Sequence, residues 1–302
     1  MRKQFIKTME DVGIADDNFA VVLGDISVFG LRKFQERHPH RFFNIGICEQ
    51  AMISFSAGLA ERGWIPIVHT IAPFLVERAY EQIKTDLCYQ KYGVNLVSCG
   101  SAFDYTPDGP THHCWADCGL LRILPGMQVS TPGSPLEFDM LFKEVYNNGR
   151  PKYFRISTAS HGVEIAPDRI RFGKAIRMKE GRALTLIALG PRLGDAMAAA
   201  ANEDVEVIYV HTMQPLDVEL IRESATRTKK ILCVEEHSVS TGLASAVSEA
   251  VGDIAGVTID RIGVPNQFVS NYGEYADVIR LLEMDPQGIA TRIRALVGGV
   301  AA

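Results

Sequence analysis

Short runs of apolar and β-branched residues alternate along this chain with longer segments in which apolar residues recur every three or four positions. The first run, at 19–23, ends at Gly24 and Asp25, and similar runs lie at 65–68 and 94–97. Strands buried on both faces read as continuous apolar runs, and parallel strands need helical crossovers between them. The alternation therefore predicts an α/β fold, in which parallel sheets carry helices on both faces.

The same alternation starts again after a stretch at 161–180 that is rich in Pro, Gly and charged residues. With 302 residues and 47% hydrophobic content, the chain is long enough for two such units. We expect a first domain at 1–165, a linker at 166–180 and a second, smaller domain at 181–302. The expected strands are 184–188, 205–209 and 231–234 in the second domain, and the expected helices are 49–62, 78–89, 193–201, 217–227 and 241–251.

Charge and hydropathy exclude several classes of protein. The net charge is −5 with acids and bases interspersed, so no basic stripe is available for a nucleic acid. The longest apolar runs, at 183–189 and 205–210, are far shorter than the roughly 20 residues of a membrane span. No apolar segment follows the basic residues near the N-terminus, so we expect a cytoplasmic protein.

One group of cysteines and histidines resembles a metal site. Cys114 and Cys118 flank Trp115 and follow His112 and His113. A structural zinc site needs a second close pair of ligands, which this spacing lacks. We therefore expect buried thiols and no metal bound by this chain.

Glu49 is the first candidate for chemistry, because it lies between a strand-like run and an apolar helix. In parallel sheets, ligands bind at the edge where strands end and helices begin. A carboxylate in that place also complements the helix dipole without any further role. Position alone favours this second, structural interpretation.

Several motifs in order along the chain resemble those of the transketolase family. Residues 44–52 are similar to its Gly-Ile-x-Glu-Gln/His motif, and 108–112 reproduce its Asp-Gly-Pro-Thr-His motif. Further similar segments are 56–60, 70–75, 78–83, 214–217, 234–238 and 242–243. The resemblance runs nearly end to end, and it implies a pyrimidine-binding domain of the thiamine-diphosphate fold followed by a transketolase C-terminal domain.

The resemblance implies thiamine diphosphate as cofactor and gives roles to the residues around Glu49. Glu49 corresponds to the catalytic carboxylate that shares a proton with the aminopyrimidine ring, and burial raises the proton affinity of such a group. Phe74 corresponds to the aromatic residue that packs on the pyrimidine, and Ile71 replaces a usual aromatic neighbour. Asp25 corresponds to an aspartate near the thiazolium side, although Gly-Asp after a strand is also ordinary turn chemistry.

The substrate residues follow from the same resemblance. His112 corresponds to the substrate-facing histidine, which hydrogen-bonds the donor oxygen and moves protons. Asp108 would orient a substrate hydroxyl, and Arg2 matches one of the family's phosphate-binding arginines. His113 is expected to be structural.

Magnesium and the diphosphate need a Gly-Asp-Gly motif and a downstream asparagine in this family, and the chain has no such pair. Gly24-Asp25-Ile26 lacks the second glycine. The resemblance therefore implies that Mg2+ and the diphosphate are held by a different, N-terminal transketolase-like subunit. An α2β2 heterotetramer is the expected assembly.

Three positions depart from the family's phosphate-binding pattern. Thr158 stands where an arginine is usual, Gly100 where a histidine is usual and Phe29 where a serine is usual. Each lost charge-assisted contact costs about 1.5–3 kcal/mol. We therefore expect a substrate without the usual terminal phosphate, or one whose anion is held differently.

The function expected from these features is transfer of a two-carbon ketol or acyl unit from a ketose or 2-oxo donor to an aldehyde acceptor. The β subunit of a 2-oxo acid dehydrogenase and a deoxyxylulose-phosphate-synthase-like carboligase are alternatives, because they share the glutamate and the two-domain plan. A third alternative is a non-catalytic module that keeps the fold only to bind another subunit.

Overall fold

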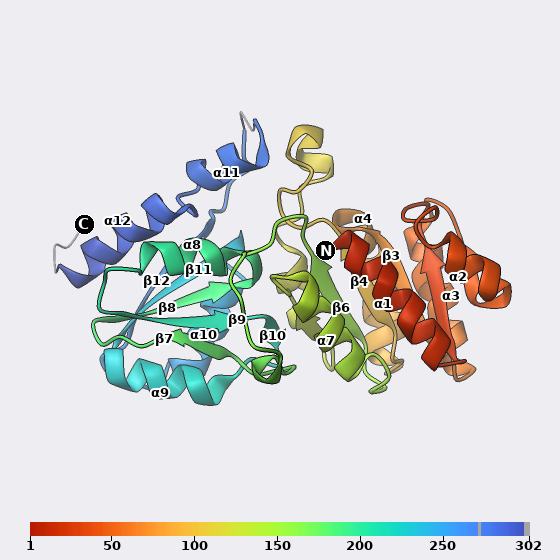
Figure 1. Cartoon of the computed structure of the whole chain (residues 1–302), viewed down its shortest axis with the longest axis horizontal. Helices are drawn as coiled ribbons and strands as arrows, with labels where there is room; N and C mark the ends of the chain where they lie inside the picture. Colours follow the sequence, from red (N-terminus) through yellow and green to blue (C-terminus); the bar gives the residue numbers. More distant parts are fainter. Residues whose placement is uncertain (271–272, 299–302) are drawn as a thin grey trace.

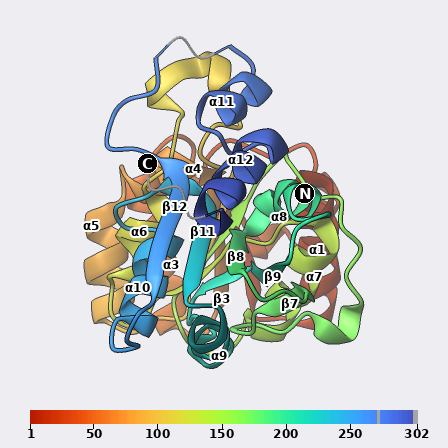
Figure 2. The same ribbon diagram turned by 90° about the vertical axis from the view of Figure 1, so that its left-hand side faces the viewer.

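The computed structural model describes residues 1–270 and 273–298. Two α/β units lie side by side along the long axis of the molecule, each built on its own sheet (Figure 1). The segment that follows β4, drawn in yellow, projects from the top of the molecule between the two units, beside the blue segment around α11 (Figures 1 and 2).

The first sheet has seven strands in the order β10-β5-β6-β4-β3-β1-β2. All neighbours are parallel except β10 and β5, which are antiparallel. The strands are β1 Phe19–Leu23, β2 Phe42–Asn44, β3 Ile65–Ile71, β4 Asn95–Cys99, β5 Gln128–Ser130, β6 Lys152–Ile156 and β10 Thr212–Gln214. The strand β10 comes from the second half of the sequence, so the chain crosses back to complete the first sheet.

The second sheet has five strands in the order β12-β11-β8-β9-β7, with only β7 antiparallel. Its strands are β7 Ile176–Lys179, β8 Leu184–Leu189, β9 Val205–Val210, β11 Lys230–Ser238 and β12 Thr258–Val264. The predicted α/β class with two mainly parallel sheets is thus confirmed. The edge strand β7 lies within the stretch that the sequence indicated as a linker.

Helices cover both faces of each sheet. In the first unit they are α1 Arg2–Ala15, α2 Arg32–Arg37, α3 Glu49–Glu61, α4 Ala72–Val76, α5 Tyr80–Gln82, α6 Asp117–Arg122 and α7 Pro135–Val145, with short helical turns at η1 Pro39–Arg41, η2 Ile83–Tyr89 and η3 Thr106–Thr111. In the second they are α8 Leu193–Ala199, α9 Val218–Thr228, α10 Leu243–Val251, α11 Tyr275–Leu281 and α12 Pro286–Val297, with turns at η4 Pro167–Arg169 and η5 Gly190–Arg192.

Neighbouring residues of the central strands enter two different cores. Val21 and Leu186 belong to one core, which also takes in α1, α7, α8 and α12. Val22 and Ile187 belong to the other, which takes in α3, η2, α6, α9 and α10. Successive side chains of a strand point to opposite faces, so a fully buried strand needs apolar residues at every position. This requirement explains the unbroken apolar runs in the sequence.

The expected helix over 78–89 is present but not regular. It begins as α5 at Tyr80 and continues as the π-helix η2 over Ile83–Tyr89. The other expected helices and strands are present with ends shifted by a few residues, and the strand expected at 231–234 extends as β11 to Ser238. Within 1–270 and 273–298, no helix is long and apolar enough to cross a bilayer.

A buried polar cluster joins the two units. Glu137 of α7 accepts hydrogen bonds from the Tyr209 hydroxyl of β9 and from the backbone N–H of Gly133 at 2.8 Å. His161 Nε2 lies 2.6 Å from the other oxygen of Glu137. Burial raises the pKa of Glu137, but the bond from His161 and the other donors outweigh it and hold that pKa below its ordinary value. The two units are therefore joined here by directional hydrogen bonds between buried polar groups.

Candidate active site

The predicted site residues collect at the carboxyl edge of the first sheet. Asp25 follows β1, and Ile71 is the last residue of β3 with Phe74 in the helix α4 behind it. The loop after β4 carries Asp108 and His112. In open parallel sheets this edge is where ligands bind. The topology therefore gathers residues that lie far apart in sequence.

Glu49 is the first residue of α3, and its side chain is buried. Oε2 accepts a hydrogen bond from the Arg78 guanidinium at 2.7 Å. Oε1 is also buried, and within the described chain it has no hydrogen-bond partner. A buried polar atom without a partner is unfavourable, so such atoms in native folds need an explanation. The dipole of α3 accounts for the charge of Glu49 but not for the free oxygen.

Arg78 is a residue of this site that sequence reasoning did not single out. Its guanidinium lies over the Phe74 ring, 4.2 Å from the centroid, while it pairs with Glu49. Glu49 therefore has a guanidinium on this side, and that guanidinium also packs on the aromatic ring. Arg78 lies in the turn between α4 and α5, so helical spacing in the sequence did not indicate this contact.

His112 lies at the other side of Phe74. The two rings meet edge to face with centroids 5.1 Å apart, and the Tyr105 ring lies 5.9 Å from His112. The Thr111 hydroxyl lies 2.9 Å from His112 Nδ1 and holds the imidazole. Contacts thus run without a break from Glu49 through Arg78 and Phe74 to His112.

Asp108 is exposed in the same loop, in the turn η3. Gly109 follows with φ of 74°, a left-handed conformation that favours glycine. The turn that carries the Asp-Gly-Pro-Thr-His motif thus has a backbone that depends on this glycine. The next histidine, His113, is buried and lies 3.0 Å from the carbonyl of Thr106.

Arg2 and Asp25 form a second group. They line a hollow of about 480 Å³ together with Phe29, whose side chain is 88% exposed. Arg2 Nε donates to the Ser27 hydroxyl at 3.1 Å, and that hydroxyl lies 3.0 Å from Nε2 of the buried His69. Asp25 has φ of 60°, and its backbone N–H donates a hydrogen bond to the Asn44 side-chain oxygen at 3.0 Å.

The pKa of His69 is lowered to about 3 by burial. The imidazole is therefore neutral, and its Nδ1 lies 2.8 Å from the carbonyl of Val97, which requires the proton on Nδ1. Nε2 is then an acceptor for the hydroxyl of Ser27, which in turn accepts from Arg2. The orientation of Arg2 is thus set by a chain of neutral groups.

The second unit holds the base of the loop that carries Asp108 and His112. Glu236, at the end of β11, accepts from the Ser101 hydroxyl at 3.2 Å and from the Phe103 N–H at 3.3 Å. Arg155 of β6 donates to the carbonyls of Glu236 and Cys114, at 2.9 and 2.8 Å. No sequence pattern predicted these contacts, because they join segments more than 40 residues apart.

Among the residues that the structure describes, Cys114, His112 and His113 are not part of a group of possible metal ligands with Cys118. Asp117, Cys118 and His237 do lie close together and buried. However, His237 Nε2 already accepts the backbone N–H of Gly119 at 3.0 Å, and Asp117 pairs with Arg155 at 3.0 Å. Burial also raises the pKa of the Cys118 thiol well above its usual value, which disfavours the thiolate that a metal needs.

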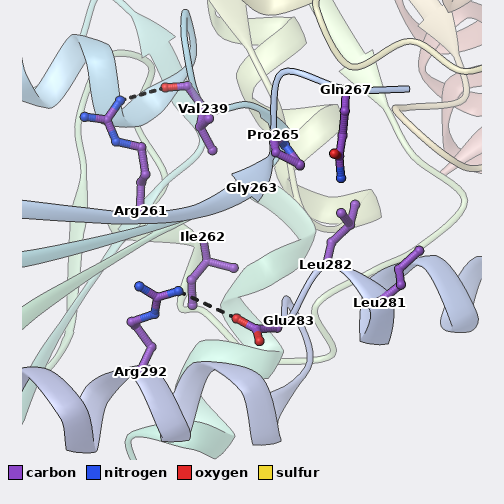
Figure 3. A pocket seen from close by; sticks show the side chains of 10 residues that line it. All are labelled: Val239, Arg261, Ile262, Gly263, Pro265, Gln267, Leu281, Leu282, Glu283 and Arg292. Atoms are coloured by element: carbon purple, nitrogen blue, oxygen red, sulfur yellow. Dashed lines mark hydrogen bonds and ion pairs between the residues drawn. The ribbon is translucent and has the colours of Figure 1, made fainter. Parts of the chain in front are cut away.

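A further hollow of about 320 Å³ lies in the second unit between β12 and the helices α11 and α12 (Figure 3). Its two arginines are already engaged. Arg261 donates to the carbonyl of Val239 at 3.0 Å, and Arg292 lies 3.7 Å from Glu283. None of the predicted site residues lines it.

Comparison with known families gives a match to each unit. The family described as "Transketolase, pyrimidine binding domain" matches residues 1–162, and "Transketolase, C-terminal domain" matches residues 173–289. The fold is thus a two-domain fold of the transketolase type, with the candidate site at the sheet edge of the pyrimidine-binding domain. The chain belongs to the transketolase family, which implies thiamine diphosphate as the cofactor.

The curated relatives are longer than this chain. The 1-deoxy-D-xylulose-5-phosphate synthase of Syntrophus aciditrophicus (strain SB) is 34% identical over 278 residues, which are 89% of this chain and 42% of that protein. The 1-deoxy-D-xylulose-5-phosphate synthase 2 of Geobacter sulfurreducens is 34% identical over 279 residues, 88% of this chain and 44% of that protein. The chain therefore spans less than half the length of these relatives.

Two solved structures are similar over nearly the whole chain. A split-gene transketolase, described as an inactive β4 tetramer, has a TM-score of 0.87 at 28% identity and covers 98% of this chain and 97% of its own. The transketolase of Leishmania mexicana has a TM-score of 0.81 at 17% identity, over 98% of this chain and 45% of its own, and shows the fold alone.

Proposed function

We propose that this chain is the pyrimidine-binding subunit of a split, transketolase-like thiamine-diphosphate enzyme. It would transfer a two-carbon ketol or acyl unit from a ketose or 2-oxo donor to an aldehyde acceptor. The observation that carries the proposal is the unpartnered Oε1 of Glu49, a buried carboxylate oxygen in a chain of this family. Its partner would be the aminopyrimidine ring of the cofactor.

The residues around Glu49 fit that cofactor. Bound thiamine diphosphate supplies a nucleophilic thiazolium carbon that carries the transferred unit. Glu49 would share a proton with the pyrimidine, and its position out of water strengthens the bond. Phe74 and Ile71 offer apolar surface for the ring, and Arg78 would keep Glu49 oriented through Oε2.

The other predicted residues face the substrate in this proposal. His112 would hydrogen-bond the donor oxygen and move protons, with the imidazole held by Thr111. Asp108, exposed in the same turn, would orient a substrate hydroxyl. Asp25 would lie on the thiazolium side, and Arg2 would reach the outer end of the substrate.

We further propose that an N-terminal, transketolase-like subunit holds Mg2+ and the diphosphate, in an α2β2 complex. The similarity to a split-gene transketolase over 97% of that chain supports this division. That relative is described as inactive when only β chains form the tetramer. A β-only assembly of this chain should accordingly lack activity.

A carboligase of the deoxyxylulose-phosphate-synthase kind is a second candidate, because the curated relatives at 34% identity carry that name. The two candidates differ in their donors. A 2-oxo acid donor releases carbon dioxide during the reaction, whereas a ketose donor leaves a shorter aldose. Measuring carbon dioxide from pyruvate against aldose from a ketose, both with an aldehyde acceptor, separates the two.

The test is co-expression with a candidate Gly-Asp-Gly-bearing subunit, followed by calorimetric titration with thiamine diphosphate and Mg2+. We expect tight binding only by the pair, and loss of activity in Glu49→Gln. Glu61→Gln, at the exposed end of the same helix, is the matched control and should behave as wild type. Tight binding by this chain alone would contradict the divided site. No binding in any combination would favour a non-catalytic interaction module.

A further inference from the structure

We propose that the site takes an unphosphorylated, hydroxylated substrate, because a carboxylate with four hydrogen-bond donors and a phenol lie close to His112 in the same loop. The carboxylate is Asp104 and the phenol is Tyr105, both in the loop that carries His112. This inference rests on the proposed function and names its substrate class. Neither residue drew attention in the sequence.

Asp104 accepts four hydrogen bonds at the mouth of the loop. Oδ1 accepts from the hydroxyls of Ser157 and Thr158 at 2.9 and 2.7 Å. Oδ2 accepts from the backbone N–H groups of Ser101 and Thr158, both at 2.8 Å. All four donors are uncharged. Within the described residues Asp104 forms no ion pair, although its charge favours the protonated forms of the Met1 ammonium and the Arg192 guanidinium. The carboxylate is therefore oriented by uncharged donors.

These donors are the groups that an anion would otherwise use. A backbone N–H and two hydroxyls at a strand end are suited to a phosphate oxygen. Here Thr158, which is exposed and stands at an expected arginine position, turns both its N–H and its hydroxyl to Asp104. The protein's own carboxylate thus takes the place of an external anion.

The ring of Tyr105 fills the space beside Gly100, the second of the positions that depart from the family's phosphate-binding pattern. Gly100 has φ of 85°, and a side chain there would place its first carbon 2.7 Å from the Tyr105 ring. A histidine at position 100 is therefore disfavoured by both backbone and packing. Burial raises the pKa of Tyr105, so its hydroxyl, 3.2 Å from Cys99 Sγ, stays protonated and neutral.

The nearby buried cations are already committed. Arg192 pairs with Asp195 at 3.0 Å and donates to the Tyr275 hydroxyl at 3.0 Å, and the Glu236 carboxylate lies 3.9 Å away. Arg155 is held by Asp117 and by two carbonyls. Arg2, with its Nε on Ser27, lines the hollow beside Asp25.

A phosphate dianion would therefore meet a fixed like charge and a neutral phenol, whereas it needs charged donors to replace its hydration. Sugar hydroxyls both donate and accept, so they can pair with Tyr105 and with Thr158 without that penalty. The pocket should accordingly prefer a ketose or aldehyde whose outer end carries hydroxyl groups only.

The test is binding and turnover by the reconstituted complex loaded with thiamine diphosphate and Mg2+. Xylulose is compared with xylulose 5-phosphate as donor, by calorimetry and by kcat/KM, with inorganic phosphate as an additional probe. We expect the unphosphorylated donor to be favoured by on the order of tenfold or more, and phosphate not to compete. A preference for the phosphorylated donor in either readout would overturn the inference. Failure of the complex to bind the cofactor would instead refute the proposed function.

Asp104→Asn keeps the shape of the side chain and removes its charge. It should raise the relative affinity for the phosphorylated donor on the order of tenfold. Asp168→Asn, an exposed carboxylate in η4, is the matched control and should leave the ratio unchanged. An unchanged ratio in a folded Asp104→Asn variant would refute the role of Asp104. If that variant does not fold, the wild-type ratio decides the question by itself.

Discussion

Replacing Arg155 by methionine tests how the two domains and the site loop are held together. The side chain is 5% exposed, and its Nε lies 3.0 Å from Asp117 Oδ2. Its two terminal nitrogens donate to the carbonyls of Glu236 and Cys114. Burial lowers the pKa of Arg155, but the Asp117 charge and other neighbours outweigh it and raise that pKa above its ordinary value. Arg155 is therefore charged at every accessible pH.

The cost follows from what the substitution leaves behind. Asp117 is fully buried, and the donors that it would keep, such as the Tyr153 hydroxyl at 2.6 Å from Oδ2, are uncharged. Removing one partner of a buried ion pair costs about 3–5 kcal/mol, because the other charge remains without compensation. The two carbonyls lose their donors at about 1 kcal/mol each. We expect Arg155→Met to lower the free energy of unfolding by roughly 5 kcal/mol.

The assay is urea unfolding of the single variants and of Arg155→Met/Asp117→Asn. The double variant removes the stranded charge, so it should recover roughly 2 kcal/mol or more relative to the sum of the single changes. Lys143→Met is the control for a solvent-exposed pair with Asp139 and should cost less than about 1 kcal/mol. The reasoning is wrong if Arg155→Met behaves like the control, or if the two single effects simply add.

Changes at three other places test separate parts of the structure. Tyr209→Phe should lower the free energy of unfolding by about 1–2 kcal/mol, measured in urea, because buried Glu137 loses a donor. The pKa of Glu137 is raised by burial but lowered more by its hydrogen bonds, from an ordinary 4.5, so this carboxylate stabilises the fold above that pH. The melting temperature should fall as pH drops below about 4.5, and less steeply in Glu137→Gln. Gly100→Ala should lower the free energy of unfolding by about 1–2 kcal/mol, because alanine is strained at a φ of 85°. Adding Tyr105→Ala to that variant should remove the steric clash with the ring but not the backbone strain. Burial lowers the pKa of Lys152 from 10.5 to about 7, so protonation favours the unfolded chain as pH falls between these values; Lys152→Met should therefore raise the melting temperature at pH 7.

The local pattern of apolar residues was sufficient to predict the α/β architecture. The run at 19–23 became β1 with the same ends, because a strand buried on both faces must be apolar at each position. Short strands such as β2 and β5, of three residues each, carry too little pattern to stand out. The strand β10 pairs with β5 although 81 residues lie between them, and no local signal specifies such a pairing.

In the candidate site, too, the sequence indicated some residues and not others. The rule that parallel strands present ligand sites at their carboxyl edge, with the motif resemblance, was enough to indicate Glu49 and His112. It did not indicate that Arg78 would engage Glu49 and Phe74, because side-chain direction depends on the break between α4 and α5. Asp104 was equally hidden, since its significance comes only from donors supplied by β6 and its own loop.

The loop with His112 depends on the second domain although that domain supplies none of the predicted site residues. Its two ends are joined by a hydrogen bond from the Cys114 N–H to the Ala102 carbonyl at 2.9 Å. The Glu236 carboxylate of the second domain accepts a further hydrogen bond from the Phe103 N–H. Trp115, just beyond, accepts the backbone N–H of Ser238 through its carbonyl at 2.8 Å. A buried hydrogen-bonded brace of this kind fixes a loop more firmly than the loop's own exposed turns can. The orientation of the candidate catalytic histidine is therefore a property of both domains together, and this is a physical reason for the two domains to share one chain.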